Sequence, residues 1–372
     1  MSARQWLPDT LDECTDFWRL HLWVRQHPGQ WSLEQVYARM VELNEGPPTD
    51  DDLAMSARLS DPWLKGIGFL RLAELNGDLT LDHDEQYLTA LIGLEPGLQL
   101  PLMRADRELR EELVWGMLCQ EGNRGVSLSA SDRSATMGSE RTPGWSRTLA
   151  ASIDEGLIER DRLLDALLDM LAADLPSGRA GWYSRTLRML SMTLDEAEAR
   201  QGALCALMSA PVGATVTVAV RQLSALSKAG RLDLELFARS CEGALMGSKA
   251  NALAALTILR GGLEALSPGG LESLLAIALS FPHAQVQGLA IELASDALRS
   301  GLLDSAAVGR LLSDAELDPL VVATLDLLDP GHAATDQADP GPVPEEGSGG
   351  QAPAAFLPPP REVADLVPMS AD

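Results

Sequence analysis

Few residues in this sequence stand at spacings that could support catalysis. Among the five histidines, one lies within a group of carboxylates, in the run Asp82-His83-Asp84-Glu85. Adjacent residues on a helix point in different directions and rarely converge on one metal ion. Carboxylates at a helix N-terminus also interact favourably with the helix dipole. We therefore interpret the run as a solvated helix start, with a metal site as the alternative.

Motifs that bind nucleotides or activate a nucleophile are absent from the sequence. A P-loop requires Gly-Lys followed by Ser or Thr, and the chain contains no Gly-Lys pair. Gly66 and Gly68 match the start of a dinucleotide fingerprint but lack its third glycine. Neither Gly-x-Ser-x-Gly nor His-Glu-x-x-His occurs. The sequence predicts a non-enzymatic protein with no cofactor, no metal and no identified small-molecule substrate.

The cysteines indicate a reducing compartment. Cys14, Cys119, Cys205 and Cys241 are far apart and match no Cys-x-x-Cys spacing, which predicts neither a disulfide framework nor a zinc site. Cys205 and Cys241 fall on apolar helical positions, where a thiol behaves as a small hydrophobe. Carboxylates occupy the place of a signal-peptide apolar run, and no stretch approaches the length of a membrane span. We expect a cytoplasmic protein without a membrane segment.

The charge balance bears on the partners that the protein can bind. The chain carries 54 Asp and Glu residues against 29 Lys and Arg residues, which gives a net charge of −25. A phosphate backbone would meet repulsion unless a local arginine cluster outweighed it. A strong acidic field favours basic partners. We therefore expect a protein partner of basic character rather than nucleic acid.

Two features have the composition of a partner-binding surface, because Trp and Arg are favoured at interface hot spots. One is the stretch 121–145, and the other is a helix face with arginines spaced at three. The candidate residues are Arg124, Arg133, Arg141 and Trp145 in the first feature, and Arg179, Trp182, Arg185 and Arg188 in the second. The competing interpretation, which we favour, places Trp182 in the core and pairs the arginines with nearby carboxylates.

The elements that would position these residues are helices. Between residues 211 and 328 one apolar pattern with offsets 0, 3, 4 and 7 occurs four times, which places four side chains on one helical stripe. The sets are Val216, Ala219, Val220 and Leu223; Ala252, Ala255, Leu256 and Leu259; Val286, Leu289, Ala290 and Leu293; and Val321, Thr324, Leu325 and Leu328. Their steps of 36, 34 and 35 residues have the length of one helix–turn–helix unit.

Breakers and caps support this repeat. Gly230 and Gly301 are predicted to stop helices and Asp233 and Asp304 to cap the next ones. Pro211 and Pro282 mark equivalent turns, and His283 stands at a helix start. Upstream we expect helices over 10–26, from Ser32 to Leu43, and from Asp195 to Ser209. A more polar stripe is predicted for Trp182, Arg185, Thr186 and Met189.

The predicted fold is all-α: a HEAT/ARM-like α-solenoid of stacked helix pairs. With 46% apolar but only 4% aromatic residues, Leu and Ala must fill the core, which suits closely packed helices. We divide the chain into an irregular helical N-terminal cap (1–120), a long Gly/Ser-rich loop (121–147), the repeats (148–330) and a disordered acidic tail (331–372). The loop lacks helical periodicity and contains a short extended piece at Val126–Leu128; it is either functional or disordered.

Several pieces, in this order and spacing, resemble a bacterial family of HEAT-like repeat proteins of unknown function. They are Glu121-Gly122-Asn123 with Ser127-Leu128-Ser129, Gly144-Trp145, Glu155-Gly156-Leu157, 160–166, 179–185, 228–233 and 281–287. The resemblance covers about residues 110–330. It implies a helical scaffold encoded near SWIM zinc-finger proteins and MoxR-type ATPases with von Willebrand A partners, and it assigns no catalytic residue.

The function that we expect is a non-enzymatic scaffold or adaptor that binds a protein on the solenoid surface. The alternative is a HEAT-like DNA-binding protein or DNA-base glycosylase, which holds DNA in a basic channel. That alternative requires the arginines to gather on one face and the carboxylates on the other. An adaptor for a ring ATPase is a third possibility that rests on the family resemblance.

Overall fold

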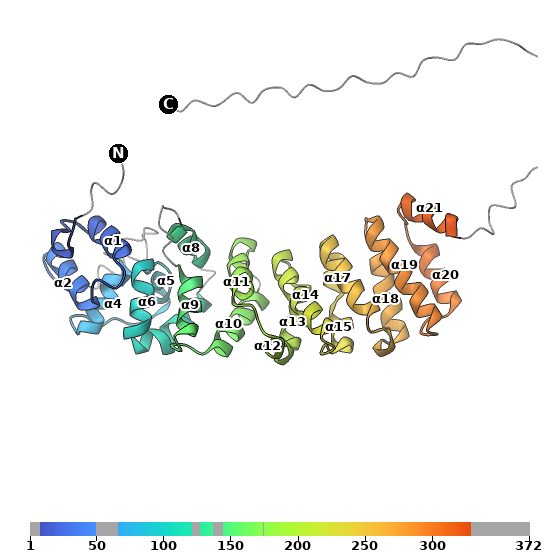
Figure 1. Cartoon of the computed structure of the whole chain (residues 1–372), viewed down its shortest axis with the longest axis horizontal. Coiled ribbons are helices and arrows are strands. Elements are labelled where there is room, and N and C mark those ends of the chain that lie inside the picture. Colours follow the sequence, from blue (N-terminus) through green and yellow to red (C-terminus); the bar gives the residue numbers. More distant parts are fainter. Residues whose placement is uncertain (1–7, 50–65, 121–126, 137–143, 174, 329–372) are drawn as a thin grey trace, which may run out of the picture. The chain divides into compact units, whose positions relative to one another are not determined.

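The computed structural model describes residues 8–49, 66–120, 127–136, 144–173 and 175–328 (Figure 1). Every regular element in these ranges is a helix, as the composition predicts. Contacts group the chain up to Ala323 into one compact unit, and the boundary to a second unit falls within α21 (Pro319–Leu328). The predicted tail at 331–372 lies outside the described residues.

The N-terminal region contains short helices of varied length. They are the 3₁₀ turn η2 (Leu11–Glu13), α1 (Phe17–Gln26), α2 (Leu33–Asn44), α4 (Ile67–Asn76), α5 (Glu85–Leu91), α6 (Pro96–Ala105), the π-helical segment η3 (Leu109–Leu113) and α7 (Val114–Cys119). The helix expected over 10–26 starts only at Phe17, because the Asp16 carboxylate accepts from the Arg19 amide and caps it there. The predicted start at Ser32 is confirmed, with a complete capping box to Gln35.

The stretch predicted as a loop contains a helix. α8 spans Leu128–Thr136, and α9 (Trp145–Asp154) begins two residues before the expected end of the loop at residue 147. The predictions of a loop throughout 121–147 and of an extended piece ending at Leu128 are therefore wrong for these residues. Serine is a poor helix former, so periodicity and propensity gave no helical signal. Burial of Leu128 and packing of α8 against α9 and α11 supply the missing stabilisation.

From α9 onward the helices form two series in which each member contacts the next. The first series comprises α11 (Ser177–Leu190), α14 (Gly213–Lys228), α17 (Lys249–Arg260) and α19 (Ala284–Arg299). The second comprises α10 (Arg160–Ala172), α13 (Gln201–Ala206), α15 (Leu234–Ser240), α18 (Pro268–Leu279) and α20 (Ser305–Asp314). In the chain, some members of the two series are separated by short elements. These are the helices α12 (Leu194–Ala199) and α16 (Glu242–Met246) and the turns η4 (Leu207–Ser209) and η5 (Leu263–Ala265). Consecutive members of the two series also pack together, as α10 does with α11 and α18 with α19.

The predicted apolar stripes lie in the core. Val216 and the equivalent Ala252 and Val286 are at most 4% exposed, and the rest of each set is buried except the half-buried Leu289. The fourth set opens with the buried Val321 in α21. The helices that carry the first three sets, α14, α17 and α19, pack consecutively against one another.

Buried residues at offsets 0, 3, 4 and 7 also occur on two helices further upstream, α11 and α9, where the sequence does not predict them. On α11 these positions are occupied by Ala180, Tyr183, Ser184 and Leu187, and on α9 by Trp145, Thr148, Leu149 and Ser152, all of them buried. The stripe predicted on α11 is wrong, because Arg185 and Met189 are exposed. Polar side chains at core positions conceal the pattern. They find internal partners: the Thr148 hydroxyl donates to Gln99 at 2.9 Å, and the Ser152 hydroxyl donates to the Thr148 carbonyl at 2.8 Å.

The predicted caps of the repeats are confirmed. Gly230 and Gly301 adopt φ values of 68° and 74°, which glycine tolerates without steric cost. The Asp233 and Asp304 carboxylates accept from the amides of Leu236 and Ala307 and so begin α15 and α20. The ring of His283 accepts from the Gln285 amide at 3.2 Å and caps α19. The single helix expected from Asp195 to Ser209 is instead broken into α12, α13 and η4.

Candidate functional site

The two sequence features with the composition of a binding surface meet around Asp132 on α8. One carboxylate oxygen of Asp132 accepts from the Trp182 indole Nε1 at 2.8 Å, and the other lies 3.4 Å from the Ser146 amide. Gly144 is needed here, because a Cβ on it would lie 2.4 Å from the Asp132 carboxylate. Asp132 therefore fixes α8 to both α9 and α11.

Both tryptophans of the candidate set belong to the core of this junction. Trp145 is fully buried and donates from Nε1 to the Ile92 carbonyl at 3.1 Å, while Trp182 is 1% exposed. This confirms the interpretation that places Trp182 in the core. It corrects the predicted surface, because neither indole is available to a partner in this structure.

The arginines of the candidate set lie in different surroundings. Arg133, Arg185 and Arg188 are exposed, and Arg179 is half-buried. Arg124 and Arg141 lie outside the described residues. Arg185 donates from Nη2 to the Ser129 hydroxyl at 3.2 Å, and this contact joins α11 to α8.

Arginines elsewhere in the repeats form a series of ion pairs between neighbouring units. The pairs are Arg160 with Glu196, Arg200 with Asp165, Arg231 with Asp195, Arg260 with Asp296, and Arg310 with Glu272, at N–O distances between 2.5 and 3.1 Å. Their members stand 35 to 38 residues apart, which is one repeat. Hydrogen bonds from Arg160 hold the pKa of Glu196 below its ordinary value, and those from Arg260 do the same for Asp296.

Arg185, Arg188 and Arg221 depart from this pattern. All three are exposed, and no ion pair with a carboxylate of the described ranges is found for any of them. Arg221 was not singled out from the sequence. The sequence nonetheless contains a signal for it. Arg185 and Arg221 stand 36 residues apart, and each follows the first buried residue of its helix stripe by five positions, on α11 and on α14 respectively.

Charge is distributed unequally among the helices of this region, although α19 of the first series carries Glu292 and Asp296. α11, α14 and α17 contain no Asp or Glu but carry seven cationic residues: Arg179, Arg185, Arg188, Arg221, Lys228, Lys249 and Arg260. α10, α12, α15, α16 and α18 carry nine carboxylates: Asp161, Asp165, Asp169, Asp195, Glu196, Glu198, Glu235, Glu242 and Glu272. We call the first group the basic series and the second the acidic series.

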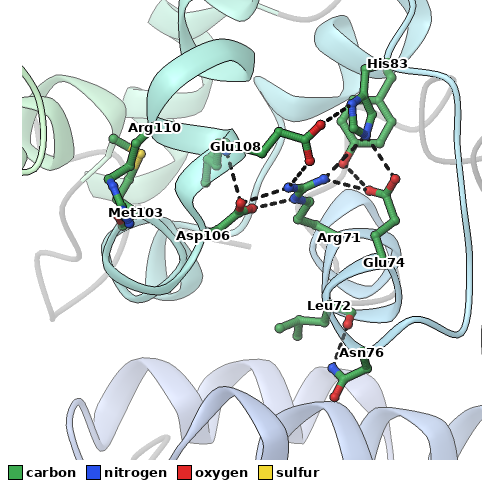
Figure 2. Close-up of polar contacts among 11 residues, drawn as sticks. Arg71, Leu72, Glu74, Asn76, His83, Met103, Asp106, Glu108 and Arg110 are labelled. Atoms are coloured by element: carbon green, nitrogen blue, oxygen red, sulfur yellow. Dashed lines mark hydrogen bonds and ion pairs between the residues drawn. The ribbon is translucent and has the colours of Figure 1, made fainter.

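A separate polar cluster in the N-terminal region surrounds Arg71 (Figure 2). Arg71 is 2% exposed and forms a bidentate pair with the buried Asp106, at 2.5 and 2.8 Å. Glu74 and Glu108 lie within 3.2 Å of the same guanidinium. Such a fork-shaped pair satisfies both groups and fixes their orientation. Because Asp106 follows α6 and also accepts from the Leu109 amide, the cluster links α4 to the start of η3.

His83 from the acidic run completes this cluster. Its ring nitrogens lie 3.0 Å from Glu74 and 3.1 Å from Glu108, and its ring packs against Tyr87. Asp84 caps α5 through the Tyr87 amide, so the prediction of a helix start is confirmed. The prediction that the run is solvated is wrong for His83, which is 23% exposed and joins two helices. Within the described ranges no group of three or more His, Cys, Asp or Glu residues is arranged to hold a metal ion.

The cysteines offer no activated thiol in the core. Cys205 and Cys241 are buried, and burial raises the pKa of their thiols to about 11 and about 12. Burial also raises the pKa of Cys14 to about 11. The thiolate is the reactive form of cysteine, so these side chains act as small hydrophobic residues at neutral pH. This confirms the interpretation of Cys205 and Cys241.

Comparison with known proteins gives one match. A family model described as a domain of unknown function (DUF6493) matches residues 105–252, which extend from the end of α6 into α17 and include the α8 junction. No curated protein sequence and no solved structure is significantly similar to the chain. In the part of the chain that the structure describes, none of the helices combines the length and the apolar character that crossing a membrane requires.

Proposed function

We propose that this chain is a helical-repeat scaffold of the HEAT-like, α-solenoid type that binds another protein without catalysing a reaction. The observation that carries the proposal is the register shared by α9, α11, α14, α17 and α19, together with ion pairs one repeat apart. Stacked repeats of this kind present an extended surface to a partner. The buried thiols and the absence of disulfides support a reducing, cytoplasmic setting.

The charges support a protein partner. With a net charge of −25, the chain attracts basic proteins at long range, and the acidic series is where such a partner would bind. By resemblance alone, we propose that the partner belongs to a bacterial multi-protein system, with a ring ATPase as one candidate. The match to a domain of unknown function is consistent with this proposal and names no partner.

DNA binding is the second candidate function, because the basic series shows part of the charge separation that it requires. Two observations favour protein over DNA. Arg260 of that series is already paired with Glu292 and Asp296, which reduces the number of cations available to phosphates. Tight DNA binding uses roughly 6–10 phosphate contacts, and the field of the whole chain opposes them.

The test is affinity purification of the full chain from its native cell, with and without nuclease, at low and at moderate salt. Proteins retained at moderate salt after nuclease treatment are the expected result. Loss of all retained material on nuclease treatment would replace the scaffold with a nucleic-acid-binding protein. Recovery of the chain alone under every condition would contradict both proposals.

A further inference from the structure

We propose that Arg185, Arg188 and Arg221 form a binding surface for an acidic polypeptide segment. We call these three residues the arginine face. The inference rests on the proposed function, because it assumes that the chain binds a protein. It goes beyond that function by naming the surface and the chemistry of the partner. This partner is acidic, whereas the net charge of the chain favours a basic one.

The arginine face lies on two helices in direct contact. α11 and α14 pack together, and packed helix axes lie roughly 8–10 Å apart. Arg185 and Arg221 occupy the same register position on these helices. Arg188 is three residues after Arg185 and therefore neighbours it on the same helix surface, at about 5–6 Å between Cβ atoms. The three exposed guanidinium groups are close enough to act on one ligand.

The helices that carry the face contain no carboxylate. Neither α11 nor α14 contains an Asp or Glu, and neither does the next helix, α17. The neighbouring α10 and α12, which pack against α11 and α14, do carry carboxylates, but all of these except Asp169 are paired with Arg160, Arg200 or Arg231. Asp132, a carboxylate of the adjoining α8, is already engaged by the Trp182 indole. On the neighbouring side, the contact of Arg185 is the neutral Ser129 hydroxyl.

Several other exposed arginines are paired with carboxylates, although Arg147 and Arg162 are also exposed and have no ion pair among the described residues. Arg107, Arg239 and Arg299 have side chains that are 67–79% exposed, yet each lies against a carboxylate three or four residues away. In a chain with 54 carboxylates, three neighbouring arginines without one form a local positive field within an acidic molecule. Such a field attracts and orients anionic groups.

The spacing favours a polypeptide over a nucleic acid. In an extended peptide, side chains on one side recur at about 6.5–7 Å, which lies between the Cβ spacing of about 5–6 Å along one helix and the roughly 8–10 Å between packed helix axes. Each guanidinium can receive a carboxylate through two parallel hydrogen bonds. Three arginines provide far fewer phosphate contacts than the roughly 6–10 that hold a protein on DNA.

A peptide-binding measurement on the full chain tests the inference. The probe is a fluorescently labelled peptide of alternating Glu and Ser, with a Gln-for-Glu peptide and a single-stranded oligonucleotide as comparisons, in anisotropy titrations at low salt. We expect the Glu peptide to bind and the Gln peptide to bind at least about tenfold more weakly. R185E/R188E/R221E should lose about tenfold or more in affinity, as expected for three exposed ion pairs.

The matched control is R107E/R239E/R299E, which changes the net charge by the same amount at arginines away from the face. It should keep the affinity within about twofold. Equal losses in the two triple variants would show that binding follows net charge alone, and unchanged binding in R185E/R188E/R221E would show that the peptide binds elsewhere. Tighter binding of the oligonucleotide than of the Glu peptide would assign the face to nucleic acid. Each of these three results overturns the inference.

A double variant separates binding from any effect on folding. R188E/R221E keeps the Arg185–Ser129 contact and should lose about fivefold in affinity for the Glu peptide.

Affinity purification with the same variants separates this inference from the proposed function. If the unaltered chain retains proteins at moderate salt and R185E/R188E/R221E retains the same set, the scaffold function stands and the arginine face is not its binding site. If the variant loses a subset that R107E/R239E/R299E keeps, that subset contains the acidic partner. Failure of the unaltered chain to retain any protein contradicts the scaffold function.

Discussion

The N-terminal region, residues 8–120, and the repeats, from α9 to the end of the first compact unit, are held together by different kinds of contact. Besides its apolar core, the N-terminal region contains single polar interactions, such as the buried pair of Arg71 with Asp106 and the part-buried bond from the Tyr37 hydroxyl to Asp78 at 2.6 Å. The repeats rely on equivalent apolar stripes and on partly exposed ion pairs that recur once per repeat. A region with unique buried pairs is sensitive to single changes, whereas a repeated contact distributes stability over many positions.

The largest effect is expected in the N-terminal region. Arg71→Ala leaves Asp106, which is 1% exposed, as a buried charge without its partner. Removing one member of a buried ion pair destabilises proteins by about 3–5 kcal/mol. Urea unfolding should show this loss, and hydrogen exchange should place it in α4, α5 and η3.

The control for this prediction is Arg107→Ala, whose side chain is 79% exposed and which should change stability by less than about 0.5 kcal/mol. The double variant Arg71→Met/Asp106→Leu should recover part of the loss, because it removes the uncompensated charge. A loss of under about 1 kcal/mol in Arg71→Ala would show that the cluster is not a main source of stability.

The second prediction concerns the core of one repeat. Leu223→Ala on α14 removes a fully buried side chain and should cost about 3 kcal/mol. If the repeats form a solenoid, the loss of hydrogen-exchange protection should be confined to α14 and its neighbours α11 and α17. Protection in α4 and α5 should remain. An equal loss across the whole chain would contradict the solenoid proposal, and with it the contrast between the two regions.

The sequence predicts the parts of this fold that depend on regular aliphatic stripes better than the parts that depend on buried polar residues or distant ion pairs. The stripes starting at Val216, Ala252 and Val286 are aliphatic, so their period is visible in the sequence. Those starting at Trp145 and Ala180 contain Thr or Ser at buried positions, which periodicity alone assigns to the surface. The pairing of Arg71 with Asp106, 35 residues apart among many other charges, leaves no local pattern.

The same distinction applies to the candidate site. Arg185 and Arg188 could be named from their spacing on one helix. Arg221 shares the register position of Arg185, but its place beside Arg185 and Arg188 follows only from the packing of α11 against α14. The polar partners of the two buried indoles are distant in the sequence: Trp182 donates to Asp132, 50 residues away, and Trp145 to the Ile92 carbonyl, 53 residues away. Composition identifies residues suited to an interface, but tertiary contacts decide which of them reach the surface.

The third prediction tests the junction between the two regions. Asp132→Ala removes the acceptor of the buried Trp182 N–H and should cost about 1–2 kcal/mol. The exchange protection of α8 should fall first, because α8 is short and depends on this contact. Asp154→Ala, at the other end of α9, is the control and should have a small effect. If α8 keeps its protection in Asp132→Ala, its attachment depends on apolar packing alone.

The smallest effect is expected for a single ion pair between repeats. Arg160 lowers the pKa of Glu196 below the ordinary value of 4.5, so the folded state binds the Glu196 proton less tightly than the unfolded state does. The pair therefore stabilises the protein above about pH 4.5, and this contribution is lost as the pH falls through the lowered pKa of the folded state. Glu196→Gln should cost at most about 1 kcal/mol at pH 7, because the pair is partly exposed. Urea unfolding at pH 7 and pH 3 should show the difference between the two proteins disappearing at the lower pH. A difference that persists at pH 3 would instead assign the effect to the capping box that Glu196 forms with Thr193.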